Sequence, residues 1–300
     1  MEKRDKLAAL RPVLDLFDPN VNMPVEQTRT IERDYGSSVP LPSGCVTSPV
    51  DLGGVPSLRI VPADADEDAA IIFYHAGGYS SGSLIGHAAY AAALCEAAGI
   101  IGFLPDYRLA PEHPFPAAIE DSCAAYQALI EQGFDPGRIA LAGDSAGGGI
   151  VFAVAQDALA RGQAGPGCIY AMSPWADLTQ SGASYDSRAA SDPLLSRAAL
   201  SDLARIYLGA HDPADPRASP LFGSFDAFPP TMIDAGANEV LLSDATRLAD
   251  RLAMAGGEVE LHVWQGLIHI FPWFAKEIED GAAANARAGA WMRRQLKGGV

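Results

Sequence analysis

A serine between two glycines has the setting of a catalytic nucleophile. Gly143, Ser145 and Gly147 form a Gly-x-Ser-x-Gly pattern. The apolar run at 139–142 predicts a buried strand before it, and the run at 150–159 predicts a helix after it. A sharp strand-to-helix turn presents the hydroxyl at the helix N-terminus, where backbone N–H groups favour developing negative charge. A serine that only caps the helix is the plainer interpretation, but the flanking strand and helix favour the nucleophile.

A serine nucleophile needs an imidazole to take its proton, and the chain has six histidines. His269 alone follows the last predicted strand, in the loop before the final helix, which suits the chain order serine, acid, histidine. We therefore predict that His269 is the general base. The other five lie in a strand pattern, in an Asp/Pro-rich loop or ahead of the nucleophile: His75, His87, His113, His211 and His262.

The acid that orients this histidine should follow the predicted strand at 231–235. Glu239 lies in the loop after that strand, and we predict it as the acid. Asp244 is the second candidate, although with Ser243 it resembles the N-terminal cap of the next helix. Asp234 lies on the strand itself. A carboxylate of either length can hold the imidazole tautomer and stabilise the imidazolium.

Backbone donors for an oxyanion are predicted one strand–helix unit earlier. His75 and Ala76 precede Gly77 and Gly78, directly after the apolar run at 71–74. Consecutive glycines let N–H groups turn toward a substrate without an intervening side chain. We predict donors at Gly77 and Gly78, with a third from the residue after the nucleophile, Ala146. The alternative is a flexible glycine turn. His75 is interpreted as a structural hydrogen-bonding residue.

Composition narrows the class of protein. The chain has 300 residues, 49% of them hydrophobic, and a net charge of −16, which argues against a nucleic-acid partner. Four cysteines without a Cys-x-x-Cys pair indicate free thiols in a reducing compartment. Residues 1–17 lack the apolar core of a signal peptide, and Glu96 interrupts the most apolar stretch at 88–105. We expect a cytoplasmic protein without a membrane span.

Apolar runs alternate with helical patterns along most of the chain, which predicts an α/β fold with a mostly parallel sheet and helices on both faces. Functional loops in such sheets follow the carboxyl ends of the strands. We predict strands at 55–61, 71–74, 100–104, 139–142, 169–172, 231–235 and 259–264. We predict helices at 88–98, 116–132, 150–159, 243–255 and 274–296, and an acidic loop at 63–68.

Two segments differ from this pattern. Residues 1–45 contain one apolar stripe at helical spacing, formed by Leu7, Leu10, Leu14 and Phe17, followed by a polar segment with several prolines. Residues 178–228 contain no predicted buried strand, but have leucines at helical spacing and an Asp/Pro-rich loop.

The combination of motifs resembles the hormone-sensitive-lipase-like carboxylesterases, a microbial branch of the α/β-hydrolases. The resemblance covers nearly the whole chain from about residue 45. It is carried by residues 75–78, 106–112, 143–148, 218–221, 229–231 and 239–242 and by His269. Two positions depart from the family pattern. Ala76 replaces the first glycine of the usual His-Gly-Gly-Gly motif, and Glu239 stands where the acid is usually aspartate.

The resemblance implies an eight-stranded, mostly parallel α/β-hydrolase sheet with a helical cap. The cap would consist of residues 1–45 and the insertion 178–228, and the catalytic core of residues 46–177 and 229–300. It implies hydrolysis of short-to-medium acyl esters through an acyl-enzyme, without a cofactor or metal. At the matching positions it implies Ser145 as nucleophile, His269 as base, Glu239 as acid, and Gly77, Gly78 and Ala146 as oxyanion donors. It also implies that Asp106, Arg108 and Glu112 brace a loop.

The substrate pocket is expected between cap and core. Its predicted walls, each equally well interpreted as a core residue, are Phe17, Trp175, Leu203, Tyr207, Leu208, Ile268 and Phe271. The expected partner is a small-molecule ester, and the resemblance also implies a homodimer through the last strand and helix. Two alternatives stay open: a non-catalytic small-molecule receptor on the same fold, and an enzyme acting on an amide, lactone or carbamate. Receptors of this kind lose the triad histidine, whereas this chain has His269.

Overall fold

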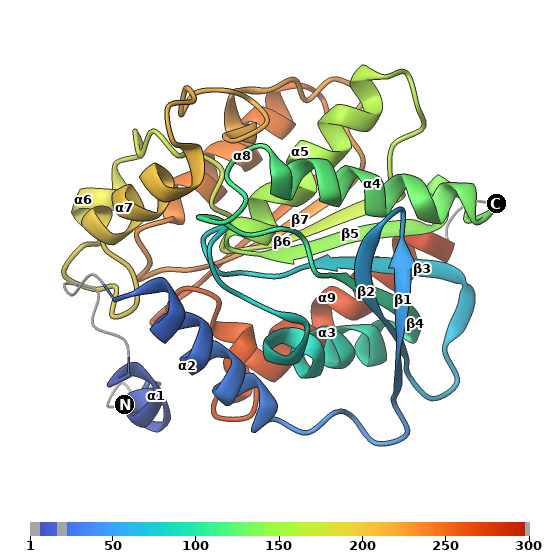
Figure 1. Cartoon of the computed structure of the whole chain (residues 1–300), viewed down its shortest axis with the longest axis horizontal. Helices are drawn as coiled ribbons and strands as arrows, with labels where there is room; N and C mark the ends of the chain where they lie inside the picture. The colour runs from blue at the N-terminus through green and yellow to red at the C-terminus, as the bar shows by residue number, and fades with distance from the viewer. Residues whose placement is uncertain (1–6, 17–22, 298–300) are drawn as a thin grey trace.

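An eight-stranded sheet crosses the centre of the molecule (Figure 1), in the order β1-β2-β4-β3-β5-β6-β7-β8. The computed structural model describes residues 7–16 and 23–297. The first two pairings, β1 with β2 and β2 with β4, are antiparallel, and all others are parallel. This confirms the predicted sheet. The strands are β1 (Val46–Leu52), β2 (Val55–Val61), β3 (Asp66–Tyr74), β4 (Ile100–Pro105), β5 (Ile139–Asp144), β6 (Cys168–Met172), β7 (Thr231–Gly236) and β8 (Val259–Trp264).

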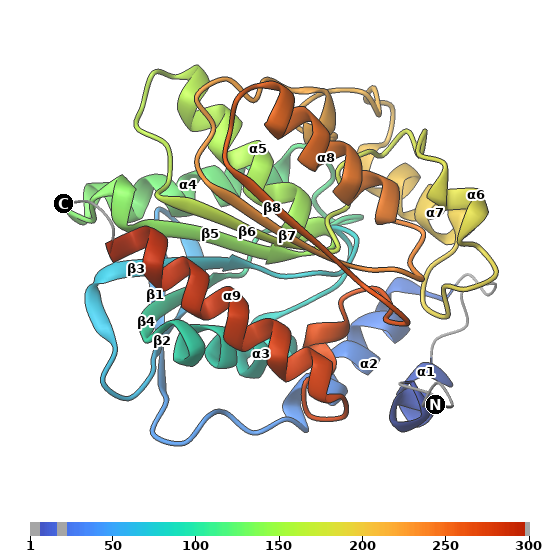
Figure 2. The same cartoon turned by 180° about the vertical axis from the view of Figure 1, so that it is seen from behind.

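Helices cover both faces of this sheet. They are α1 (Arg11–Leu14), α2 (Val25–Ser37), α3 (Leu84–Ala98), α4 (Ala117–Glu131), α5 (Ala146–Ala160), α6 (Ser184–Ser187), α7 (Arg197–Leu208), α8 (Leu242–Met254) and α9 (Glu279–Lys297). Short 3₁₀ helices are η1 (Ala8–Leu10), η2 (Pro136–Arg138), η3 (Pro220–Phe222) and η4 (Phe271–Phe274). One face carries α4, α5 and α8, and the other carries α3 and α9, as Figures 1 and 2 show from opposite sides.

Each face has its own apolar core, which explains why the central strands are apolar on both sides. Ile72 of β3 and Leu141 of β5 belong to the core under α4, α5 and α8. Their neighbours Ile71 and Ala142 belong to the core under α3 and α9. Because side chains alternate between the faces of a strand, a run such as 71–74 must be apolar throughout. The central strands are therefore apolar throughout because helices cover both faces of the sheet.

The register of the parallel strands brings the functional loops to one level. Tyr74 at the end of β3 is paired with Gly143 of β5. Met172 at the end of β6 is paired with Asp144 of β5 and with Asp234 of β7. The loops that leave these strands therefore start side by side at the carboxyl edge of the sheet, where sites in such folds lie. The helices α2 and α7 lie at the same end of the sheet, at the left in Figure 1 and at the right in Figure 2.

Several sequence-based boundaries were wrong. Strand β1 and helix α2 were not predicted, because β1 is largely exposed and α2 has few apolar residues. The acidic loop expected at 63–68 ends earlier, since β3 starts at Asp66 with exposed residues beyond the apolar core. The last helix starts at Glu279 rather than at 274, after a 3₁₀ turn that contains Pro272. Phe17, the end of the expected N-terminal stripe, lies outside the described residues.

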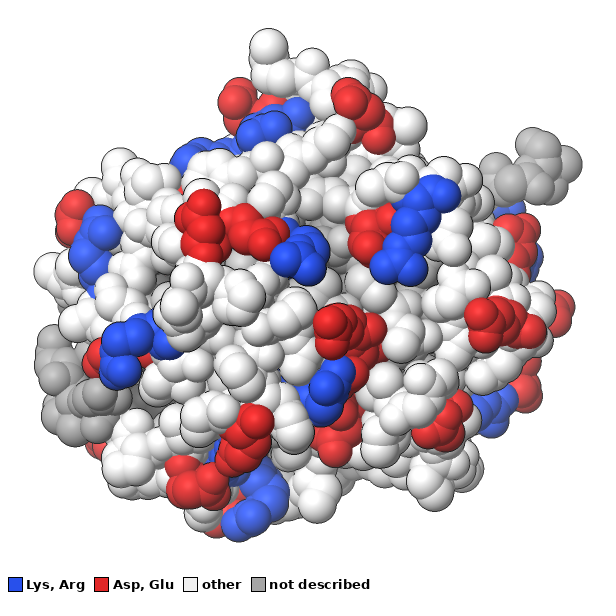
Figure 3. All heavy atoms as spheres, turned by 45° about the horizontal axis from the view of Figure 1, so that its top comes forward, with Lys and Arg blue, Asp and Glu red and all other residues white. Residues whose placement is uncertain are grey.

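The insertion between residues 178 and 228 forms no strand and carries α6, α7 and η3. Helix α7 begins at the Ser196 cap, whose side chain accepts the N–H of Ala199, and ends at Gly209. Its buried face includes Leu200 and Tyr207. Within residues 7–16 and 23–297, no helix combines the length and the apolar character needed to cross a bilayer. On the face drawn in Figure 3, acidic and basic side chains are interspersed.

Helix α2 is held so close to α3 that their backbones touch. A Cβ added at Gly36 would overlap the carbonyl group of Gly86, in the first turn of α3. Backbone cannot move aside as a flexible side chain can, so the contact fixes the distance between the two helices. The position of α2 over the carboxyl edge of the sheet therefore depends on this glycine.

We predict that Gly36→Ala destabilises the protein by about 1–3 kcal/mol, because overpacking forces α2 and α3 apart. Thermal unfolding followed by circular dichroism would show this as a lower Tm. Gly137→Ala is the control, since its added Cβ meets only the Asp135 side chain, at 3.4 Å. An unchanged Tm for Gly36→Ala would contradict the close contact.

Candidate active site

The structure places Ser145 on a sharp turn between β5 and α5. Its backbone has φ 53° and ψ −115°, a conformation that a residue with a side chain rarely adopts. The Ser145 N–H donates to the carbonyl of Met172 at 2.9 Å, and the Ser145 carbonyl accepts from the Trp175 N–H at 2.8 Å. A Cβ on Gly147 would overlap the carbonyl of Tyr74. The turn therefore requires glycine at position 147, because a side chain there would collide with the end of β3.

Three polar side chains from separate loops meet at this turn. The Nε2 atom of His269 lies 3.0 Å from the Ser145 hydroxyl oxygen. On the other side of the ring, Nδ1 lies 3.1 Å from an oxygen of Glu239. Ser145 is 5% exposed, His269 3% and Glu239 0%. The structure thus brings together the residues predicted as nucleophile, base and acid, with bonding distances at both links.

Burial raises the pKa of Glu239, and the neighbouring His269 opposes this by favouring the charged carboxylate. The Ser173 hydroxyl acts in the same direction as the histidine. Ser173 also accepts the Ile270 N–H at 3.0 Å, which ties the histidine loop to the loop after β6. Because the buried Glu239 carboxylate cannot hydrogen-bond to solvent, its hydrogen bond to the His269 imidazole is stronger than the same bond would be in water.

The other acidic candidates have different partners. One oxygen of Asp244 accepts the N–H groups of Ala176 and Asp177, both at 2.9 Å, and the Tyr185 hydroxyl at 3.2 Å. Asp244 thus fastens the loop after β6 and does not contact the imidazole. Asp234 on β7 accepts from Tyr170, Trp264 and Arg287.

Asp192 is a buried carboxyl group near the site that the sequence analysis missed. It accepts the Val240 N–H at 2.8 Å, directly after Glu239. It also accepts the N–H groups of Leu194 and Leu195, at 2.9 and 3.0 Å. Burial raises its pKa, and the charge of His269 opposes the shift. The only sequence signal was an Asp-Pro pair within the insertion.

The glycines after β3 lie beside the nucleophile. Gly77 has φ 122° and Gly78 has φ 57°, both in the region that favours glycine. Ala76, which replaces a family glycine, is not left-handed, so its methyl group causes no strain there. Ala146 is the first residue of α5, a position whose N–H has no partner within a helix. Gly77 and Gly78 line the same pocket as Ser145 and His269, which suits N–H donors for an oxyanion.

This pocket has a volume of about 180 Å³. Of the predicted walls, Trp175 and Leu203 line it, together with unpredicted apolar residues of the N-terminal segment, of α7 and η4, and of the loops just before these two helices. These include Met23, Val25, Leu194, Leu195, Ala199, Leu200, Ile206, Ile270, Trp273 and Phe274. Helical spacing indicated α7 but could not show which of its apolar residues face the site. Nothing in the sequence indicated Met23 and Val25, which lie just before and at the start of α2, because this helix has few apolar residues.

Four predicted pocket residues, Tyr207, Leu208, Ile268 and Phe271, are core residues, and the prediction was wrong for them. They do not belong to the lining of this pocket. Tyr207 stacks on Tyr79, with ring centroids 4.0 Å apart, and Phe271 packs against Trp264 at 5.2 Å. Leu208 and Ile268 are buried among other apolar side chains. Phe17, the seventh predicted wall, lies outside the described residues.

His75 supports the loop rather than the reaction. It is fully buried, its Nδ1 lies 2.7 Å from the Ala76 carbonyl, and its ring stacks on Tyr107. Burial lowers the pKa of His75 to about 4, so the ring is neutral at neutral pH. The Tyr107 hydroxyl donates to the His75 carbonyl at 2.7 Å. These contacts hold the start of the glycine loop.

Two of the three remaining motif residues, Arg108 and Glu112, form ion pairs on the surface of the core. Arg108 pairs with Asp121, with a shortest distance of 2.7 Å. Glu112 pairs with Arg29 of α2 at 2.8 Å and so fastens this helix to the core. Asp106 makes no such pair with either arginine among the described residues. In the part of the chain that the structure describes, no group of three or more His, Cys, Asp or Glu side chains could hold a metal ion.

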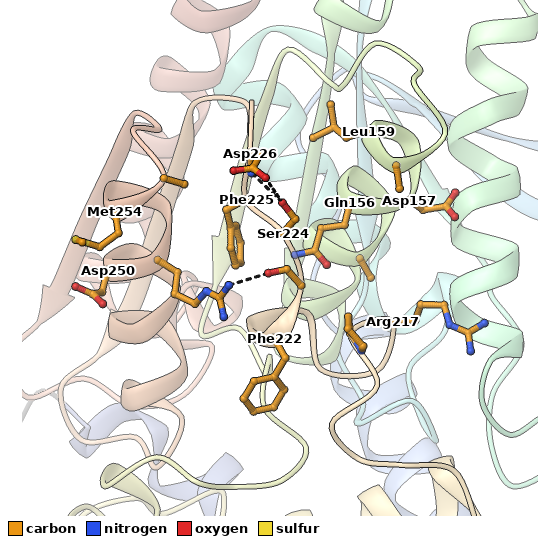
Figure 4. A pocket seen from close by; sticks show the side chains of 16 residues that line it. Gln156, Asp157, Leu159, Arg217, Phe222, Ser224, Phe225, Asp226, Asp250 and Met254 are labelled. Carbon is orange, nitrogen blue, oxygen red and sulfur yellow. Dashed lines mark hydrogen bonds between the residues drawn. The ribbon is translucent and has the colours of Figure 1, made fainter.

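A second and larger cavity, of about 1030 Å³, lies between α5, α8 and residues 216–226 (Figure 4). Ser145, His269 and Glu239 do not line it. Its arginines are engaged: Arg251 donates to the Gly223 carbonyl at 2.9 Å, and Arg217 pairs with Asp215. Figure 4 also shows Ser224 bonded to Asp226 within the wall. It is an open surface hollow without the residues of the candidate site.

Comparison with known proteins shows the family. A family profile described as alpha/beta hydrolase fold matches residues 71–273. An acetyl-hydrolase of Streptomyces hygroscopicus is 39% identical over 244 residues, which cover 81% of each chain. A crystal structure of an esterase from the bacterial hormone-sensitive lipase family has a TM-score of 0.94 and 34% identity, covering 99% of both chains.

A crystal structure of the protein EstE5, soaked with p-nitrophenyl butyrate, has a TM-score of 0.92 and 33% identity, and covers 97% of this chain and 99% of that one. These similarities extend over the strands that carry the serine, the carboxylate and the histidine. With such identity across most of its length, the protein belongs to the hormone-sensitive-lipase-like carboxylesterases of the α/β-hydrolase fold.

Proposed function

We propose that this carboxylesterase cleaves short-to-medium acyl esters with a Ser145–His269–Glu239 triad. The observation that carries the proposal is the unbroken link from hydroxyl to imidazole to carboxylate, at 3.0 and 3.1 Å. A hydroxyl is a weak nucleophile unless a base takes its proton, and the imidazole is within reach to do so. The buried carboxylate holds the ring in the tautomer that leaves Nε2 free to accept.

In the first step, the Ser145 oxygen attacks the ester carbonyl carbon while His269 Nε2 takes the hydroxyl proton. The resulting tetrahedral oxyanion accepts hydrogen bonds from the N–H groups of Gly77, Gly78 and Ala146. The carbon–oxygen bond to the alcohol breaks, and His269 delivers its proton to the leaving alkoxide. An acyl group remains on Ser145.

In the second step, water attacks the acyl carbonyl and gives a proton to His269. The bond to the Ser145 oxygen then breaks, the proton returns to that oxygen, and the carboxylic acid leaves. Each proton that the imidazole takes is given back within the same half-reaction, so no cofactor is needed. Glu239 stays ionised throughout and stabilises the imidazolium.

The proposed preference for short-to-medium acyl chains rests on the pocket. Its volume is about 180 Å³, and Leu203 stands beside Gly78 in its wall. The soaked ligand of EstE5 is also an ester of a short acid. We propose that residues 1–45 and 178–228 form a cap over the core 46–177 and 229–300. Helices α2 and α7 from these two segments contribute to the pocket wall.

A homodimer and a cytoplasmic location remain proposals. The first rests on the family resemblance, and β8 is an edge strand of the sheet whose residues are all half-buried. The second rests on the four cysteines, which are all free.

Removal of the nucleophile is the first test of the mechanism. We expect Ser145→Ala to lower kcat for p-nitrophenyl butyrate by about four or more orders of magnitude. The fold should survive, since alanine fits wherever serine does. A fluorophosphonate should label the parent protein at Ser145, as detected by peptide mass spectrometry, and should not label the variant. Turnover retained in Ser145→Ala would refute the assignment.

The acid is tested by two variants that keep the size of the side chain but replace its carboxylate with a neutral amide. We expect Glu239→Gln to lower kcat by about three orders of magnitude, because the amide no longer stabilises the imidazolium. Asp244→Asn should change kcat less than about tenfold and should mainly lower the Tm, since Asp244 holds backbone N–H groups. The reverse ranking in steady-state kinetics would transfer the role to Asp244.

Two leucines of α7 test the pocket wall, because only one of them lines it. We expect Leu203→Ala to raise the ratio of kcat/KM for p-nitrophenyl octanoate over butyrate by about tenfold, since the truncation gives longer chains room. Leu208→Ala is the matched control: it should lower stability by about 2–5 kcal/mol and leave the ratio unchanged. Equal ratios in the two variants would mean that Leu203 does not limit chain length.

A further inference from the structure

Helix α2 reaches the glycine loop with a carboxylate. One oxygen of Glu32 accepts the Ser81 hydroxyl at 3.0 Å, and the other accepts the Gly82 N–H at 2.8 Å. The Ser81 oxygen also lies 3.0 Å from the Gly77 carbonyl. The single Ser81 hydroxyl proton can serve only one of these two acceptors, but the Gly77 carbonyl also accepts the Ser81 N–H at 2.9 Å. Ser81 therefore links the peptide unit of Gly77 to the Glu32 carboxylate. Glu32 itself lines the pocket that contains Ser145.

Arg29 holds the same loop one turn earlier on the same face of α2. Its Nε donates to the Ser80 carbonyl at 2.9 Å, and its Nη2 donates to the Ala110 carbonyl at 3.0 Å. Two further bonds of 2.8 Å join the guanidinium to Glu112. Together, Arg29 and Glu32 contact three successive residues, 80–82, which follow the glycines proposed as oxyanion donors after one intervening residue.

The glycine loop needs such external contacts. Gly77 and Gly78 have no side chains that could pack against the core, and without a Cβ their backbones are freer than those of other residues. Both adopt positive φ angles, so the loop must be held in this conformation by other contacts. Donors for an oxyanion are effective only when they are fixed before the reaction, because reorganisation costs energy at the transition state. The loop is anchored to the core by His75 at its start. After the glycines, Arg29 and Glu32 of α2 hold residues 80–82.

We propose that Glu32 is a positioning residue for the oxyanion hole: from α2 it fixes Ser81 and Gly82, and thereby the orientation of the Gly77 and Gly78 N–H groups. This inference rests on the proposed function of these glycines. It assigns to the N-terminal segment a part in the rate of the chemical step, in addition to a wall of the substrate pocket. Glu32 does not touch the reacting atoms.

The charge of Glu32 matters for this role. Only the ionised carboxylate offers both oxygens as acceptors without competition from its own proton. Burial raises the pKa of Glu32 to about 7, opposed by its two hydrogen bonds and by Arg29. The titratable groups that face it from the loop after β4, from β5 and across the pocket are Tyr107, Asp144, His269 and Asp202. The loop should therefore be held best above about pH 7.

The test uses Glu32→Gln, which keeps size but loses one acceptor, and Ser81→Ala, which removes the other partner and leaves α2 intact. We expect each to lower kcat for p-nitrophenyl butyrate by about ten- to hundredfold while KM changes less than about twofold. Rates are divided by the fraction of Ser145 labelled by a fluorophosphonate, so that misfolded protein does not count. Asp34→Asn, an exposed position on the same helix, should match the parent.

Two readouts separate positioning from a merely structural effect. The double variant Glu32→Gln/Ser81→Ala should be about as slow as either single variant, because both remove the same restraint. The ratio of parent kcat to Glu32→Gln kcat should be large at pH 8 and approach one at about pH 5.5, where the parent carboxylate is protonated.

Several outcomes would overturn the inference. An unchanged kcat in either variant would do so, as would a rise in KM without loss of kcat, additive losses in the double variant, or a pH-independent ratio. A fluorophosphonate that fails to label Ser145 in the parent protein would instead contradict the proposed function. Normal labelling and normal turnover in Glu32→Gln would leave the triad intact and remove only the role of Glu32.

Discussion

The whole site depends on the backbone of one residue, Ser145, which is held in a conformation that costs roughly 1–3 kcal/mol for a side chain of this kind. The cost is offset locally: its N–H is bonded to the Met172 carbonyl at the end of β6, and its carbonyl accepts from Trp175 just beyond. Gly147 admits the Tyr74 carbonyl from the other neighbouring strand. The central place of β5 between β3 and β6 therefore does more than bury apolar surface. It supplies, from both sides, the contacts that keep the hydroxyl exposed toward the pocket.

The alignment of the remaining groups follows from strand register. Because the parallel strands end at one level, the glycines after β3, the carboxylate after β7 and the imidazole after β8 need only short loops to converge. Each of these loops is held in place by a different buried polar side chain. His75 is buried and neutral beneath the glycine loop, and Ser173 ties the histidine loop to the loop after β6. Asp192 bonds the backbone beside Glu239. Asp192 thus restrains the loop that carries Glu239 without itself contacting the imidazole.

Sequence reasoning was most successful where one local rule decides the outcome. Runs such as 71–74 are apolar on both faces only in a covered parallel sheet, and His269 is the one histidine that follows the last strand. It was weakest where long-range contacts decide. Helix α2 has few apolar residues, and its position depends on a backbone contact of Gly36 and on the ion pair of Arg29 with Glu112, far along the chain. Periodicity likewise identified the apolar face of α7, but both Leu203 and Tyr207 satisfy it, and only packing shows that Tyr207 stacks inside the core while Leu203 faces the pocket.

The polar contacts of α2 with the glycine loop also have a consequence for exchanging parts between related esterases. Chimeras that graft a foreign N-terminal segment to alter substrate range would change more than the shape of the entrance. A donor segment without an acidic residue at the position of Glu32 would lose the contacts with Ser81 and Gly82, and one without a basic residue at Arg29 would lose the contact with Ser80. The reactive side chains themselves would still be complete. A chimera of this protein should therefore exchange α2 and the glycine loop that it contacts together, as one unit.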